Sequence, residues 1–235
     1  MLAKRVIPTM LVRGRALVKG ERFKGDRSIG HALQAARIHA ARGVDELMIL
    51  DIGATAEGRG PDLDLVRDLS AGCFIPITVG GGVKSLHDID ALLRAGADKV
   101  CIGAATTIAL LHAASQRFGR QAIVVSLDIG PRFAYPTPTL AAVLFEQWGA
   151  GEILLQSVGR DGTMAGYDIP LIHQVSGAVD IPVIASGGCS GYEDMAAAFR
   201  AGADACAAGA LFAFTDATPR GAAQFLRTQG MEVRL

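Results

Sequence analysis

The chain has 235 residues, half of them apolar, which is enough to bury one sizeable core and is an ordinary length for a single closed α/β barrel. Its 23 basic and 23 acidic residues cancel, and no run of lysine or arginine stands out. This balance argues against nucleic acid or an anionic membrane surface as a partner.

No segment approaches the roughly 18 apolar residues that span a bilayer, and the start of the chain lacks a signal-peptide pattern. The four cysteines lie apart, with no CxxC pair and no neighbouring histidine pair. We therefore expect reduced thiols in a cytoplasmic protein, with no metal site, no cofactor and no membrane contact.

Short apolar segments rich in valine and isoleucine recur along the chain, separated by segments of helical length. Nearly continuous apolar character is typical of parallel strands that are buried on both faces. We predict strands at Arg5–Leu11, Glu46–Asp51, Ile75–Val79, Lys99–Ile102, Ala122–Asp128, Glu152–Ser157, Ile181–Ala185 and Ala205–Ala208. With seven intervening helices and one helix after the last strand, this is the count of a (βα)8 barrel.

An internal repeat supports a barrel over a doubly wound open sheet. Ile75–Ala104 recurs 106 residues later as Ile181–Ala210, with thirteen of thirty positions identical and no gap. A duplicated block of four βα units closes naturally into a barrel of two similar halves. We expect one barrel over residues 1–235, with its site at the carboxyl ends of the strands.

The repeat carries glycines between a strand and a helix, where backbone N–H groups and the helix dipole favour phosphate. One lone pair of glycines would indicate no more than a tight turn. Here the arrangement occurs twice, and each copy is followed by a second small-residue turn. We predict a ligand with a phosphate at each end, bound by Gly81, Gly82, Gly103, Ala104, Gly187, Gly188, Gly209 and Ala210.

Several segments together resemble the HisF family, the cyclase subunits of imidazole glycerol phosphate synthase. They are MLAKRVIPTMLV, LVKG, GVDELMILDI, VGGGVKS, LLRAGADKV, GAGEILLQSVGRDGTMAGYD, IPVIASGG and the final VRL, which extend over essentially the whole chain. The resemblance implies a (βα)8 barrel that receives ammonia from a HisH-like glutaminase docked at its N-terminal face. The ammonia would react with a bisphosphorylated aminoimidazole-carboxamide ribonucleotide, giving imidazole glycerol phosphate and AICAR.

By the same resemblance, Asp128 is a general acid or base, and further substrate-binding residues are Lys19, Asp51, Asp161 and Gly162. The family's charged ammonia gate at the bottom of the barrel corresponds to Arg5, Glu46, Lys99 and Glu152. Two acids and two bases could also neutralise one another as a structural plug. The sequence does not separate a plug from a gate.

The chain departs from the family at the first strand, where Leu11 stands in place of a second catalytic aspartate. Leucine cannot transfer a proton, and general acid–base catalysis typically contributes ~10²–10⁴-fold. Gly103-Ala104 replaces Asn-Thr, Ala210 replaces Ser, and the segment after Asp128 is shorter than the family's loop. These departures indicate altered cyclase chemistry.

A branch of HisF-like proteins that supplies nitrogen for amidino sugars of surface polysaccharides resembles this chain more. That branch shares the apolar first-strand residue, followed by Leu17-Val18-Lys19 and Phe23. Two alternatives stay open: an authentic cyclase of histidine biosynthesis, and a non-catalytic conduit that activates the glutaminase. A HisA-type isomerase is the weakest alternative, because it too requires the first-strand aspartate.

Overall fold

The computed structural model describes residues 3–103 and 105–234. Eight parallel strands form its centre, and all eight were predicted from the sequence, with ends that differ by no more than two residues. Their bounds are β1 Arg5–Arg13, β4 Leu47–Asp51, β5 Ile77–Gly80, β6 Lys99–Gly103, β7 Ile123–Ile129, β8 Glu152–Ser157, β9 Val183–Ser186 and β10 Ala205–Ala208.

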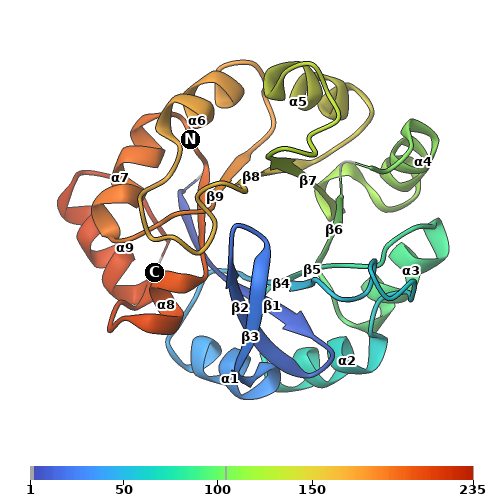
Figure 1. Cartoon of the computed structure of the whole chain (residues 1–235), viewed down its shortest axis with the longest axis horizontal. Coiled ribbons are helices and arrows are strands. Elements are labelled where there is room, and N and C mark those ends of the chain that lie inside the picture. The colour runs from blue at the N-terminus through green and yellow to red at the C-terminus, as the bar shows by residue number, and fades with distance from the viewer. Residues whose placement is uncertain (1–2, 104, 235) are drawn as a thin grey trace.

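The eight strands close into a barrel. Each pairs in parallel with its neighbour in the order β1, β4, β5, β6, β7, β8, β9, β10, and β10 pairs back onto β1. This closing ladder rules out the open doubly wound sheet and confirms the (βα)8 fold (Figure 1).

Helices surround the barrel on its outer side (Figure 1). They are α1 Ala32–Ala41, α2 Leu63–Gly72, α3 Leu86–Ala95, α4 Ile108–Phe118, α5 Pro138–Gln147, α6 Ile169–Ser176, α7 Tyr192–Arg200, α8 Ala210–Phe214 and α9 Pro219–Thr228. The expectation of a single helix after the last strand was wrong, because the short α8 precedes the terminal α9. None of the described helices is long and apolar enough to cross a membrane.

An antiparallel hairpin, β2 Ala16–Glu21 with β3 Lys24–His31, extends from β1 and was not predicted. Seven of the eight β3 residues are exposed, so the strand lacks the apolar alternation that predicts a half-buried strand. Its turn has Arg22 and Phe23 at φ 52° and 60°, where two left-handed residues are needed to match the twist of the strands. The hairpin lies across the mouth of the barrel (Figure 1).

The core has two layers. Inside the barrel, alternate residues of the strands pack together, as the period of two along a strand requires; they are Ile7, Met48, Cys101, Val124, Leu154, Ile184, Ala205 and Ala207. The other strand faces pack against the helices in a larger apolar cluster. The barrel axis is therefore lined by apolar side chains between its two ends.

The duplication seen in the sequence is repeated in the hydrogen bonds. Asp98 accepts from the backbone N–H of Ile77 at 2.8 Å, and Asp204 accepts from that of Val183 at 3.1 Å. In each pair, the first residue of a strand (β5 or β9) is bonded to the residue that precedes the next strand (β6 or β10). The two pairs are 106 residues apart, as are the two copies of the repeat. The two half-barrels thus share their internal anchors as well as their motifs.

Candidate active site

A cavity of about 380 Å³ opens at the carboxyl ends of the strands. It is lined by the predicted catalytic residue and by all but one of the predicted substrate-binding residues: Lys19, Asp51, Gly81, Gly82, Gly103, Asp128, Asp161, Gly162, Gly187, Gly188, Gly209 and Ala210. Ala104 lies outside the described residues. The structure thus brings residues from both halves of the chain to one site.

The first glycine turn lies between β5 and α3. Gly81 and Gly82 have φ values of 114° and 71°, in the region that favours glycine. A Cβ on Gly81 would overlap the backbone carbonyl of Asp51, and one on Gly82 would lie 2.8 Å from the carbonyl of Arg59. Only glycine fits this close packing, and it leaves the backbone bare toward the cavity.

The second glycine turn repeats this packing between β9 and α7. Gly187 and Gly188 have φ values of 92° and 102°. A Cβ on Gly187 would lie 2.6 Å from the carbonyl of Ser157, and one on Gly188 would overlap the carbonyl of Gly166. Ser157 stands 106 residues after Asp51, so the same contact is used in both halves.

The two small-residue turns differ in the space around them. A Cβ on Gly103 would meet nothing within 4 Å, whereas one on Gly209 would overlap the Lys19 ammonium and lie 2.9 Å from the carbonyl of Thr9. Ala210 begins α8 and is buried. The cavity is therefore open beside β6 and filled by Lys19 beside β10.

Lys19 reaches into the cavity from the hairpin, with 8% of its surface exposed. Its ammonium donates to the carbonyl of Thr9 at 3.3 Å. Burial lowers the pKa of Lys19 to about 8, although the Asp161 carboxylate opposes this. Burial likewise raises the pKa of Asp161, against the attraction of Lys19 and a 3.1 Å hydrogen bond from the Gln156 amide. The hairpin also bonds here, through the Arg22 N–H to the Asp161 carbonyl at 2.9 Å.

Asp128 stands near the end of β7, with its carboxyl accessible from the cavity. Surrounding protein raises its pKa by desolvation, and a hydrogen bond from the Ser126 hydroxyl to Oδ1, 2.7 Å long, opposes that shift. A carboxyl that can be reached from the cavity is a group of the kind that takes and gives protons in general acid–base catalysis. Leu11 lines the same cavity from β1 and offers no such group.

Asp51 is buried and engaged by protein groups. Its Oδ1 accepts from the backbone N–H groups of Gly53 and Ala54 at 2.9 and 3.1 Å, and Arg59 donates to Oδ2 at 2.6 Å. In this arrangement Asp51 fixes the loop between β4 and α2, which packs against the first glycine turn.

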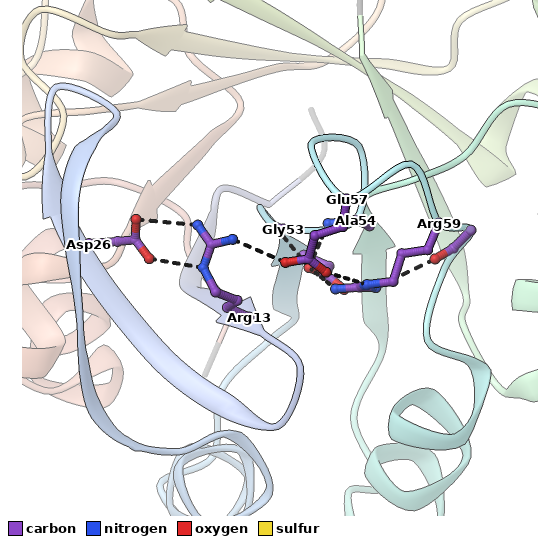
Figure 2. A network of polar contacts seen from close by, with 8 residues as sticks. Arg13, Asp26, Gly53, Ala54, Glu57 and Arg59 are labelled. Carbon is purple, nitrogen blue, oxygen red and sulfur yellow. Dashed lines mark hydrogen bonds and ion pairs between the residues drawn. The ribbon is translucent and has the colours of Figure 1, made fainter.

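Arg59 continues this contact into a chain of charges across the cavity mouth (Figure 2). It donates to Glu57 at 2.7 Å; Glu57 accepts from Arg13 at 3.2 Å, and Arg13 also donates to Asp26 at 3.2 and 3.3 Å. The chain joins the hairpin to the β4–α2 loop. Sequence reasoning missed it, although Arg13 follows Leu11 by two residues and so shares its face of the strand.

The predicted gate residues meet at the opposite end of the barrel. Arg5 donates to Glu46 at 2.7 Å and lies 3.2 Å from Glu152, while Lys99 lies 3.1 Å from Glu46 and 2.9 Å from Glu152. The Thr78 hydroxyl adds a 2.6 Å hydrogen bond to Glu46. Acids and bases thus alternate in a closed ring, the charge ring, formed by Arg5, Glu46, Lys99 and Glu152.

The charge ring compensates for the burial of its members. Burial alone would raise the pKa of Glu46, but Lys99 and Arg5 outweigh it and hold that pKa below its usual value. The four side chains are between 4% and 18% exposed, so the ring closes this end of the barrel. Among residues 3–103 and 105–234, no cluster of three histidine, cysteine or acidic side chains could hold a metal ion.

The fold and the duplicated glycine turns define the class: a (βα)8 barrel of two similar halves, with a site built at one mouth. Residues 5–218 match the protein family described as "Histidine biosynthesis protein". The chain belongs to this family, and within it to the HisF type, the cyclase subunit of imidazole glycerol phosphate synthase.

Two relatives illustrate the similarity. The imidazole glycerol phosphate synthase subunit HisF of Hyphomonas neptunium is 44% identical over 250 aligned positions, which include all of this chain and 99% of the relative. A protein of Campylobacter jejuni with the assigned name imidazole glycerol phosphate synthase subunit hisF2 is 40% identical over 248 positions, covering both chains completely. Both alignments are longer than this chain, so the relatives contain short segments that it lacks.

Proposed function

We propose that this chain receives ammonia from a HisH-like glutaminase and adds it to a bisphosphorylated substrate held in the cavity. The observation that supports this most directly is the pair of equivalent glycine turns facing one cavity. Two bare backbone turns at helix N-termini suit two phosphate groups. Because the two turns lie in opposite halves of the barrel, a ligand that contacts both must be long and have a phosphate at each end.

The charge ring is the proposed entrance for ammonia. It occupies the end of the barrel opposite the cavity, and apolar side chains line the axis between them. Ammonia is small and uncharged, so it can pass an apolar interior that excludes ammonium, whose charge is costly to bury. Passage requires one ion pair of the ring to open for a moment.

The glutaminase is proposed to dock on the same end of the barrel as the ring. Phe74, in the loop that leads into β5 at this end, is 96% exposed. A fully exposed aromatic ring beside the proposed entrance suits a protein interface, where aromatic residues serve as anchors.

Proton transfer in the cavity is proposed to depend on Asp128. Addition of ammonia to a substrate carbon requires that the incoming nitrogen lose a proton and that the leaving atom gain one. Leu11 cannot take part, and Asp51 and Asp161 are engaged by Arg59 and Gln156. Asp128 therefore serves both directions, and this is the altered cyclase chemistry that we propose. Lys19 and the glycine turns hold the substrate.

For the biological role, we propose nitrogen transfer in the synthesis of amidino sugars of surface polysaccharides, in the cytoplasm. Leu11, together with Leu17-Val18-Lys19 and Phe23, supports this role over histidine biosynthesis. Deletion of the gene distinguishes the two. Loss of the nitrogen-bearing sugar with growth unaffected by histidine is the expected result, whereas a histidine requirement would establish the authentic cyclase.

The chemistry is tested by ammonium-dependent turnover of the bisphosphorylated aminoimidazole-carboxamide ribonucleotide. We expect slow but measurable turnover by the wild type and none by Asp128→Asn. Turnover at ordinary enzyme rates would contradict altered chemistry. No turnover, combined with glutaminase stimulation that survives Asp128→Asn, would establish a non-catalytic ammonia conduit instead.

A further inference from the structure

Ser126 lies beside the one carboxyl on which the proposed proton transfer depends. It precedes Asp128 by two residues on β7, so both side chains point to the same face of the strand, and both line the cavity. The Ser126 hydroxyl donates to Oδ1 of Asp128 over 2.7 Å. Short hydrogen bonds to a carboxylate are among the stronger ones in proteins.

The residues paired with this segment on the neighbouring strands do not donate a side-chain hydrogen bond to Asp128. On β6, the residue paired with Ser126 is Gly103, which has no side chain and has open space where a Cβ would be. On β8, Gln156 is paired with Asp128, but its amide donates to Asp161 at 3.1 Å. Neither residue therefore supplies a side-chain donor to the carboxyl.

We propose that Ser126 is a positioning residue, which holds the carboxyl of Asp128 in one orientation for proton transfer. This inference rests on the proposed function, in which Asp128 transfers the protons. A terminal carboxyl rotates broadly about its last bond. Because Oδ1 is bound to Ser126, the second oxygen is the one left for proton transfer in the cavity. Leu11, on the opposite side of the cavity, offers no carboxyl that could take over when the first is misaligned.

The same hydrogen bond adjusts the protonation of Asp128. Desolvation raises the pKa of Asp128, and the bond from Ser126 favours the ionised form and lowers it. Within the described part of the chain, the other titratable groups that interact with this carboxyl are the Cys101 thiol on β6 and Asp161 beyond β8. Burial raises the pKa of Cys101 to about 12, so the thiol stays neutral and does not supply the missing proton donor near neutral pH.

Ser126→Ala removes the hydroxyl, and Ser126→Thr retains it on a side chain that the strand tolerates. Ser70→Ala is the matched control, because its hydroxyl bonds the carbonyl of Ala95 in the helical layer, away from the cavity. Two readouts are used: the pH profiles of kcat and KM with ammonium, and a carbon-13 titration of the Asp128 carboxyl, assigned with Asp128→Asn.

We expect Ser126→Ala to lower kcat roughly tenfold with little change in KM, the effect of one hydrogen bond to a charged group. The acid limb of kcat and the carboxyl titration should both move to higher pH. Ser126→Thr should restore both, and Ser70→Ala should change neither. A titration and a kcat that are the same in Ser126→Ala and the wild type would overturn the proposal.

Failure of the proposed function gives a different pattern. If the wild type has no ammonium-dependent turnover at any pH, the cyclase reaction is excluded, and with it any role of Ser126 in that reaction. The titration still decides whether Ser126 orients Asp128: a shift in Ser126→Ala that Ser126→Thr reverses supports the contact, and an unmoved titration overturns it.

Discussion

Leu11 on β1 and Asp128 on β7 line one cavity from opposite sides of the barrel, because their strands lie four apart in a closed order of eight. An apolar side chain thus faces a carboxyl across the place where a substrate would react. The chain thus has the family's carboxyl on β7, but it has a leucine where the family has a second aspartate on β1. Restoring a carboxyl at β1 is therefore the most direct test of what this exchange changed.

Leu11→Asp is expected to raise ammonium-dependent turnover by ~10²-fold or more, the contribution of one general acid or base. Leu11→Asn is the matched control, because asparagine has nearly the same shape as aspartate and is also polar, but it cannot transfer a proton at neutral pH. Steady-state kcat of the two variants is compared with the wild type. Equal gains in both variants would mean that polarity at β1, and not proton transfer, limits the reaction.

Gly103 and Gly209 occupy equivalent positions in the two halves but differ in their surroundings. Gly209→Ala is expected to destabilise the protein by about 1–3 kcal/mol, because the new methyl group would displace the Lys19 ammonium and press on the carbonyl of Thr9. Gly103→Ala projects into open space and should change the free energy of unfolding by less than about 0.5 kcal/mol. Urea denaturation measures both, and a larger loss in Gly103→Ala would contradict the difference.

The barrel could be predicted because buried parallel strands appear in the sequence as short apolar segments, and because the long repeat can be recognised in the sequence directly. The glycine turns of the cavity followed from the rule that barrel sites lie at the carboxyl ends of strands, whereas the roles of Lys19, Asp51, Asp128, Asp161 and Gly162 came from the resemblance to the HisF family. The contacts of Lys19 could not be predicted in this way, since the hairpin that carries it has no apolar alternation in β3. Nor could the contact of Arg13 with Asp26, which depends on how that hairpin folds back over β1.

Asp51 illustrates a second limit. Its position at the end of β4 follows from the sequence, but its partners do not. Arg59 and the N–H groups of Gly53 and Ala54 bind its oxygens through the shape of one loop. The pattern of a strand predicts the position of a residue along that strand and the face on which its side chain lies. The partners of the side chain depend on the conformation of the neighbouring loop.

Phe74→Ser is expected to weaken binding of a HisH-like glutaminase about tenfold or more, because loss of an aromatic anchor typically costs over 1 kcal/mol. Ile108→Ser is the control: Ile108 is 51% exposed and begins α4, at the cavity end of the barrel. Titration calorimetry with the purified glutaminase gives both affinities. If Ile108→Ser weakens binding and Phe74→Ser does not, the partner docks on the other face.

Lys99→Met should destabilise the protein by about 3 kcal/mol at neutral pH, because it leaves Glu46 and Glu152 buried with Arg5 as their one cation in the charge ring. Arg67→Met is the matched control, since its ion pair with Asp64 is exposed and should contribute less than about 0.5 kcal/mol. Denaturant unfolding of each variant supplies the free energies.

The pH dependence of the Lys99→Met effect gives the sharper test. The pKa of Glu46 is lowered in the folded state, so the stability it contributes is complete above the ordinary glutamate value of about 4.3 and is lost as the pH falls through the lowered folded value. A protonated carboxyl no longer needs the cation, so the gap between wild type and Lys99→Met should shrink in acid. A gap that stays constant from neutral pH down to about pH 3 would mean that the Lys99 side chain stabilises the barrel by packing and not by its charge.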